Sequence, residues 1–227
     1  MSWQSYHQSL VRYPQHGFSL DLSLMDIAPG HADALAPRIE KAFADLAAVE
    51  SGAIANPDEG RMVGHYWLRN AALAPTEELR RAVTEPLAAL KQFAEQIHTG
   101  GIAPPSGGNF QQVLLIGIGG SALGPQLVSE AIGQNARLPL HFFDNTDPAG
   151  MDAVLARLAR TGLDQTLVLV ISKSGGTAET RNGMLEAKAA FEAAGLDFGR
   201  HAAAVTGSGS KLDQYAEQHR FLTRFPM

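Results

Sequence analysis

The sequence predicts an α/β fold in which a doubly wound, mostly parallel five-stranded sheet follows an N-terminal helical segment. In the second half of the chain, short apolar runs alternate with helical patterns, as in successive strand–helix units. These apolar runs are continuous, which is typical of parallel strands covered on both faces. In the first half, apolar residues recur at spacings of three and four, which favours helices.

The composition narrows the classes of protein to which the chain can belong. Of 227 residues, 45% are hydrophobic and 18% are charged, so the chain can form a large core and is unlike a disordered protein. The net charge of −5 argues against nucleic-acid binding, which needs a basic surface. The absence of cysteine excludes thiolate metal sites, and the eight histidines form no metal-binding pattern.

We expect a cytoplasmic protein that has neither a membrane nor a nucleic acid as its partner. No apolar run approaches the about 20 residues that span a bilayer. The N-terminus lacks the charged and apolar regions of a secretory signal. The absence of cysteine also fits a reducing compartment.

Two long helices are predicted before residue 100. The first covers residues 32–49 and places on one face Leu35, Ile39, Phe43, Leu46 and Val49. The second begins after Thr76, whose hydroxyl can cap it, and carries Glu77 and Glu78 in its first turn. Because proline removes a backbone donor, we expect a kink or a new helix start at Pro86.

A glycine- and proline-rich linker, residues 100–109, separates these helices from the strand–helix units. We therefore divide the chain into a helical segment with its linker, residues 1–108, and a ligand-binding domain, residues 109–227. Within this domain, the predicted strands are residues 113–116, 138–143, 167–171, 202–205 and 221–222.

Four helices are predicted between these strands. The first is expected to bury Leu127, Val128, Ala131 and Ile132. The second starts at Asp147 as the N-cap, with Pro148 at the first helical position. The third places on one face Met184, Ala187, Phe191 and Ala194. The fourth covers residues 211–218.

Two glycine- and hydroxyl-rich strings each follow a predicted strand: GIGGSALGP, residues 117–125, and SKSGGTAET, residues 172–180. Glycines allow backbone amides to approach a ligand, and amides at a helix N-terminus are unpaired donors that stabilise an anion. Parallel strands end at one edge of a sheet, where ligands bind. The two strings therefore suggest one anionic ligand held from two sides.

The side chains of these strings suit a phosphate group. The donors are the hydroxyls of Ser121, Ser172, Ser174 and Thr177 and the cation of Lys173. Roughly this many donors can satisfy three phosphate oxygens. A simpler interpretation is that Ser121 and Thr177 only cap helices and that the glycines only form turns. That interpretation fits either string alone, whereas both strings at matching positions favour a ligand.

A dinucleotide is the competing ligand. Residues 117–122 satisfy the pattern G-x-G-x-x-[GA], and Asp144 follows the next strand, where a ribose-binding acid would lie. A dinucleotide fold does not need the second hydroxyl-rich string. The pair of strings therefore favours a phosphate over NAD.

Together the two strings resemble the paired signatures of the glucose-6-phosphate isomerase family, within the sugar-isomerase (SIS) fold group. The resemblance spans roughly residues 40–225. It includes residues 60–69, which we expect to be helical and which resemble a family segment more weakly than the two strings do. It implies a flavodoxin-like sheet and no cofactor. It further implies that the substrate 6-phosphate is held by Ser121, Ser172, Ser174 and Thr177, with the backbone of Gly120 and Lys173 assisting.

The implied reaction is the reversible interconversion of glucose 6-phosphate and fructose 6-phosphate in glycolysis and gluconeogenesis, through ring opening and a cis-enediol. It needs a carboxylate base, a cation beside the enediolate and an acid–base group. The family's arginine, glutamate, histidine and lysine for these roles have no matching position and are expected beyond Met227. The resemblance thus implies an N-terminal portion of a dimeric enzyme, without catalytic residues or turnover of its own.

One alternative function and several residue roles also remain open. The chain could be a non-catalytic sugar-phosphate-binding regulatory module, although no basic helix-turn-helix pattern accompanies it. We expect a packing role for His65, dipole compensation for Glu179, and loop-shaping or capping roles for Asp144 and Asp147. Arg181 could pair with Glu179 or approach the anion.

Overall fold

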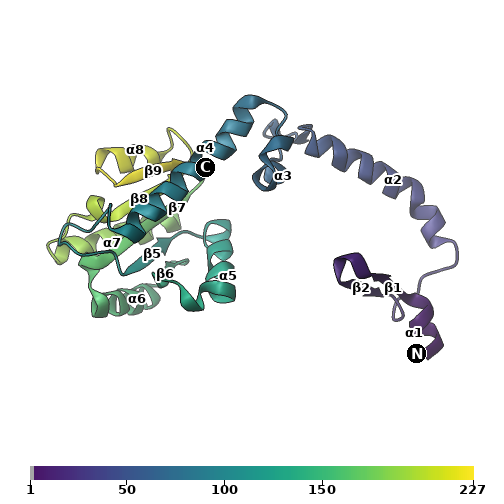
Figure 1. The fold of residues 1–227 in the computed structure, drawn as a ribbon, viewed down its shortest axis with the longest axis horizontal. Helices are drawn as coiled ribbons and strands as arrows, with labels where there is room; N and C mark the ends of the chain where they lie inside the picture. The colour runs from purple at the N-terminus through teal and green to yellow at the C-terminus, as the bar shows by residue number, and fades with distance from the viewer. Residues whose placement is uncertain (1–2) are drawn as a thin grey trace. The chain divides into compact units, whose positions relative to one another are not determined.

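The computed structural model describes residues 3–227 and forms two compact units, Met1–Arg80 and Arg81–Met227. The division falls inside helix α4 (Glu77–Thr99), because most of this helix packs on the sheet of the second unit (Figure 1). The sequence placed the division later, at the linker before residue 109. That boundary, as the limit of a domain, stays a prediction.

The first unit combines helices with two short antiparallel hairpins that were not predicted. Its helices and strands are α1 (Trp3–Ser9), β1 (Leu10–Tyr13), β2 (Phe18–Asp21), α2 (His31–Glu50), β3 (Ile54–Asn56), β4 (Arg61–Met62) and α3 (His65–Arg69). Helix α2 confirms the first predicted helix. The helical prediction for residues 60–69 is wrong at its start, where β4 turns back on β3. Gly60, with φ of 63°, closes that turn.

The first unit has almost no core of its own. Among residues 3–80 only Trp67 is buried, and its indole Nε1 donates a hydrogen bond of 3.0 Å to the carbonyl of Glu50. The predicted apolar face of α2 exists, but Ile39, Phe43 and Leu46 are exposed. Periodicity therefore predicted the helix but not the degree of its burial.

Helix α4 begins as predicted. The hydroxyl of Thr76 accepts a hydrogen bond of 3.2 Å from the amide of Leu79. The helix continues through Pro86 to Thr99, so no new helix starts at the proline. One missing backbone donor does not end α4, because the next turns pack Phe93 and Ile97 onto the sheet.

The second unit is built on five parallel strands in the spatial order β6-β5-β7-β8-β9. The strands are β5 (Gln112–Ile116), β6 (Leu140–Phe143), β7 (Thr166–Ser172), β8 (Ala202–Thr206) and β9 (Thr223–Pro226). This confirms the predicted doubly wound sheet, which is wholly parallel and has the flavodoxin-like order. The last strand was predicted at residues 221–222, but β9 begins only at Thr223. The reason is that the amide of Phe221 still donates a hydrogen bond to the carbonyl of Ala216, at the end of the preceding helix.

Helices α5 (Leu123–Ile132), α6 (Pro148–Thr161), α7 (Ala178–Ala193) and α8 (Lys211–Gln218) connect the strands (Figure 1). Asp147 caps α6 as predicted, accepting a hydrogen bond of 2.9 Å from the amide of Gly150. Among the described residues, no helix combines the length and apolarity needed to cross a bilayer.

The two faces of the sheet have separate cores. On the first, which we call the closed face, side chains of α6, α7 and α8 pack against Leu114, Ile116, Val168 and Val170. On the second, which we call the open face, α4 packs Phe93 and Ile97 against Val113, Leu167, Ala203 and Phe225. Successive strand residues alternate between the faces, as expected for continuous apolar strands.

The prediction of burial for α5 is wrong. Helix α5 buries none of its predicted apolar residues: Leu127 is 69% exposed, Ile132 is 77% exposed, and Val128 and Ala131 are also exposed. Apolar spacing predicted the helix, but no described element covers this side of it. On α7, three residues of the predicted face, Met184, Ala187 and Phe191, are buried. Ala194 is exposed and lies just beyond the helix, which ends at Ala193.

Candidate functional site

The two glycine- and hydroxyl-rich strings lie at the carboxyl ends of neighbouring strands, β5 and β7. Ile116 of β5 pairs with Val170 of β7, and the strand order reverses between these strands. A crevice at such a switch point is where open α/β sheets bind ligands. A Cβ atom on Gly117 would lie 3.3 Å from the carbonyl oxygen of Ile171, so the two chain segments approach closely there.

The first string presents an open backbone. Gly119 has φ of 55° and begins a short 3-10 turn that ends at Ser121. A Cβ atom on Gly119 or Gly120 would meet no atom within 4 Å. Helix α5 starts after Ala122 and has no side-chain cap, so the interpretation of Ser121 as a helix cap is wrong.

The second string places two hydroxyls side by side. Ser172 is buried, and its Oγ donates a hydrogen bond of 3.1 Å to Oγ1 of Thr177. Thr177 occupies the N-cap position of α7, but its side chain accepts no hydrogen bond from the helix amides. The capping interpretation therefore does not account for this hydroxyl either. Lys173 and Ser174 are exposed at the tip, where Ser174 Oγ accepts a hydrogen bond of 3.2 Å from the amide of Gly176.

The loop after β8 holds the second string in place. Oγ1 of Thr206 donates a hydrogen bond of 2.5 Å to the carbonyl of Ser172 and lies 2.8 Å from Oγ of Ser210. The amide of Gly207 donates to the carbonyl of Lys173 at 3.0 Å. Gly175 has φ of 64°, and any Cβ there would collide with Ser210.

Sequence reasoning missed Thr206 and Ser210. A signal was present, because residues 206–210 read TGSGS and follow the fourth predicted strand with the same glycine and hydroxyl composition. Their contact depends on register, since Thr206 pairs with Ser172 across β8 and β7. The sheet therefore brings a third loop to the site.

The remaining candidates have local partners. Asp144 accepts hydrogen bonds from Nε2 of Gln126 at 2.6 Å and from Nδ2 of Asn145 at 2.8 Å, so it shapes the loop after β6. Glu179 lies in the first turn of α7, as expected for dipole compensation. His65 is exposed, and its ring lies 4.1 Å from that of Tyr66.

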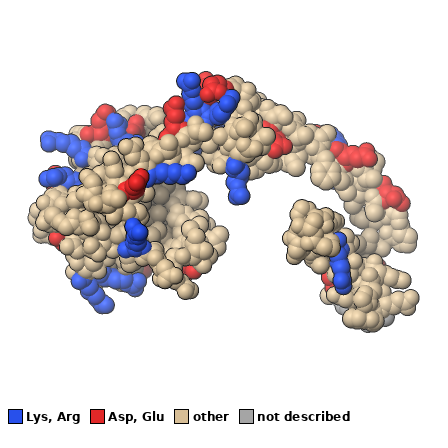
Figure 2. Space-filling model, in the orientation of Figure 1, with Lys and Arg blue, Asp and Glu red and all other residues tan. Residues whose placement is uncertain are grey.

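The charged groups do not indicate a metal or a broad basic surface. Among residues 3–227, no group of three or more histidines and carboxylates is arranged to hold a metal ion. On the face drawn in Figure 2, lysines and arginines are interspersed with aspartates and glutamates. Anion binding at the two strings would therefore depend on local donors.

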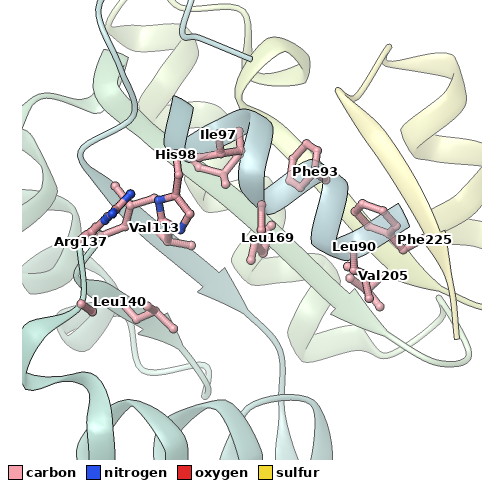
Figure 3. A pocket seen from close by; sticks show the side chains of 14 residues that line it. Leu90, Phe93, Ile97, His98, Val113, Arg137, Leu140, Leu169, Val205 and Phe225 are labelled. Atoms are coloured by element: carbon pink, nitrogen blue, oxygen red, sulfur yellow. The ribbon is translucent and has the colours of Figure 1, made fainter. Parts of the chain in front are cut away.

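Two cavities differ in chemistry. A cavity of about 140 Å³ adjoins the second string and is lined in part by Ser172 and Thr177. A larger one, of about 600 Å³, lies on the open face, where Figure 3 shows Phe93 and Ile97 above the strands and Arg137 at one end. The larger cavity is almost wholly apolar, whereas the smaller one includes hydroxyl groups of the second string.

Comparison with known proteins agrees with this geometry. A model of the phosphoglucose isomerase family matches residues 34–219, which include both strings. A glucose-6-phosphate isomerase from Rippkaea orientalis is 56% identical over 226 residues, and one from Geobacter sp. is 54% identical over 226 residues. The crystal structure of a glucose-6-phosphate isomerase from Chlamydia trachomatis is 26% identical, with a TM-score of 0.80, over 100% of this chain and 43% of that one.

The matches cover nearly all of this chain but less than half of each relative. The alignments with the Rippkaea and Geobacter proteins include 99% of this chain and 42% of each of those proteins. The sequence match, the shared fold and the presence of both strings agree with one another. The chain belongs to the phosphoglucose isomerase family.

Proposed function

We propose that the chain is the phosphate-binding part of a glucose-6-phosphate isomerase. In this proposal, the crevice between the ends of β5 and β7 holds the 6-phosphate of glucose 6-phosphate or fructose 6-phosphate. The observation that carries it is the adjacency of two glycine- and hydroxyl-rich strings whose side chains do not serve as helix caps. The names of the related proteins support the choice of sugar phosphate.

Each string contributes a different part of this cradle. Ser121 and the amide of Gly120 approach the phosphate from the end of β5. Ser172, Ser174 and Thr177 approach it from the end of β7, with the backbone of Lys173 assisting. The amides at the start of α7 add unpaired donors and the positive end of a helix dipole.

The second string needs little rearrangement to bind. Its backbone carbonyls at Ser172 and Lys173 are fixed by Thr206 and Gly207. Donors that are already positioned lose less conformational entropy when a ligand binds. Thr206 and Ser210 are therefore proposed as residues that position the cradle without touching the phosphate.

The reaction would be a reversible aldose–ketose isomerisation in the cytoplasm that needs no cofactor. It requires ring opening and proton transfer between two neighbouring carbons through an enediol, with a base and a stabilising cation. We assign no residue of this chain to those steps. In this proposal, the chain supplies binding and orientation without turnover of its own, and the whole enzyme is a homodimer.

Calorimetric titration with fructose 6-phosphate tests the proposal, with fructose and NAD as controls. We expect binding of the phosphorylated sugar alone. Thr177→Ala and Ser121→Ala should each weaken binding about tenfold, as expected for one lost hydrogen bond to a charged group. Thr177→Ser keeps the hydroxyl and should bind like the original chain.

Two results would overturn the assignment. Binding of NAD in place of fructose 6-phosphate would favour the dinucleotide interpretation of the first string. Unchanged affinity for fructose 6-phosphate in both alanine variants would show that the phosphate does not bind in this crevice. Far-UV circular dichroism of each variant shows whether the fold is retained.

A further inference from the structure

The loop after β8, residues 206–210, is held by an acid of the following helix as well as by the second string. Asp213 lies in the first turn of α8, and its Oδ2 accepts a hydrogen bond of 2.8 Å from the amide of Gly209. The amide of Asp213 donates to Oγ of Ser210 at 3.1 Å. Asp213 therefore fixes two consecutive residues of the loop, one through its side chain and one through its backbone.

This contact differs from an ordinary helix cap. In a capping box, the acid at the third helical position accepts a hydrogen bond from the amide of the N-cap residue. Here Ser210 is the N-cap and Asp213 is at the third position, but the acid binds the amide of the preceding residue, Gly209. The amide of Ser210 donates instead to the carbonyl of Gly207. The carboxylate therefore holds the loop and not only the start of α8.

The backbone of the loop needs such a partner. Gly209 has φ of 73°, which glycine adopts readily but which leaves the free loop many alternative conformations. Nε2 of Gln214 donates a hydrogen bond of 3.0 Å to the carbonyl of Gly209. Two side chains of α8 thus bind both the amide and the carbonyl of this one glycine, which selects a single loop conformation.

Arg224 of β9 orients the carboxylate. Helix α8 lies beside β9 (Figure 1), and Nη1 of Arg224 donates to Oδ1 of Asp213 at 3.1 Å. Nη2 of Arg224 donates to Oε1 of Glu217 at 3.1 Å. Ion pairs between partly exposed side chains such as these contribute little to stability. The geometric effect is more specific, because Arg224 binds one oxygen of Asp213 and leaves the other directed at the loop.

The loop in turn contacts the second string at two points. Oγ of Ser210 lies 2.8 Å from Oγ1 of Thr206, which donates to the carbonyl of Ser172. The amide of Gly207 donates to the carbonyl of Lys173 at 3.0 Å. A Cβ atom on Gly207 would lie 2.9 Å from that same carbonyl oxygen, so the two backbones are in close contact. A continuous series of contacts therefore joins β9 to the second string through α8 and the loop.

We propose that Asp213, oriented by Arg224, is a positioning residue for the sugar-phosphate cradle. It holds the loop after β8 in the geometry that fixes the second string. Neither side chain lines the cavity beside that string, so neither is assigned a contact with the ligand. The inference rests on the proposed function for the identity of the ligand, whereas the effect of Asp213 on the loop is measurable without ligand.

Amide hydrogen exchange of the chain without ligand gives the first measurement. Asp213→Ala should speed exchange of the amides of Gly175 and Gly207 at least about fivefold, because both amides bond to backbone carbonyls at the contact between the string and the loop. Amides of the central strand β5 should exchange as in the original chain. Asp213→Asn keeps an oxygen that can accept from the amide of Gly209, and should retain slow exchange.

Calorimetric titration with fructose 6-phosphate gives the second measurement. Asp213→Ala should weaken binding about fivefold, because the second string is less well ordered before the ligand binds, and Asp213→Asn should restore most of the affinity. Arg224→Met leaves every contact between α8 and the loop and should weaken binding about threefold. Glu217→Gln changes only the other partner of Arg224, so this matched control should bind like the original chain.

The possible failures are distinguishable. If the original chain binds fructose 6-phosphate and Asp213→Ala binds it equally well, the positioning role is overturned and the proposed function stands. Unchanged exchange at Gly175 and Gly207 in Asp213→Ala overturns the role as well. If the original chain does not bind fructose 6-phosphate, the proposed function fails and the role in a sugar-phosphate cradle fails with it. Far-UV circular dichroism and urea unfolding show whether each variant retains α8.

Discussion

The closed and open faces of the sheet are made from similar strand residues but are covered very differently. On the closed face, Leu158 of α6 and Phe191 of α7 are fully buried in the core that the helices form with the sheet. On the open face, a cavity of about 600 Å³ remains beside α4. The apolar residues of α5 also face solvent. Continuous apolar strands are typical of a sheet that is covered on both faces. They do not indicate which element covers each face.

The largest expected effect comes from a truncation on the closed face. Phe191→Ala should lower the free energy of unfolding by about 3–5 kcal/mol, because it leaves a cavity in a well-packed core. Leu169→Ala on the open face should cost about 2 kcal/mol or less, because Leu169 already lines a cavity. Urea unfolding followed by circular dichroism measures both. Equal losses would show that the two faces are packed equally well in solution.

The second prediction concerns the exposed apolar surface of α5. Large apolar patches favour association, so we expect the chain to self-associate at micromolar concentrations through α5. Leu127→Lys combined with Ile132→Glu should weaken this association at least about tenfold. Each side chain is exposed, so stability should change by less than about 0.5 kcal/mol.

Sedimentation velocity over a range of concentrations measures this association. Glu130→Lys alters the charge of α5 at an exposed polar position and is the control. A chain that remains monomeric at every concentration would contradict the prediction. The exposed apolar residues of α5 would then not cause association in solution.

The same contrast explains how far the sequence could predict the fold and the site. The strand runs predicted the sheet, and their glycine-rich ends predicted that the two strings meet at one edge. The burial of α5 could not be predicted, because periodicity reports a face and not the element that covers it. The contact between Thr206 and Ser172 could not be predicted either, since it depends on the register between two strands.

A third, smaller effect is expected at the edge of the closed face. Thr206→Val should weaken fructose 6-phosphate binding about tenfold, because the carbonyl of Ser172 keeps only the amide of Gly175 as a donor and the second string becomes more mobile. Thr206→Ser retains the hydroxyl and should bind normally. Calorimetric titration provides the measurement. If both variants bind with unchanged affinity, the loop after β8 does not position the cradle.

The smallest expected effect is a pH dependence of the closed face. His201 is fully buried, its ring lies 5.2 Å from that of Phe191, and Nδ1 is 3.2 Å from the carbonyl of Thr166. Burial lowers the pKa of His201 below its usual 6.5, although the contact with the Thr166 carbonyl acts in the opposite direction. The folded protein therefore holds this histidine neutral at a pH where the unfolded chain already binds a proton.

The sign of the effect follows from this difference in proton binding. The stabilising contribution is fully present above pH 6.5 and is lost as the pH falls from 6.5 through the lower folded pKa. One proton gives a slope of at most about 1.4 kcal/mol per pH unit. Unfolding free energies measured at pH 5, 6 and 7 should show this slope, and His201→Gln should reduce it. An identical slope in that variant would mean that other groups cause the loss of stability in acid, and that burial on the closed face does not control this histidine.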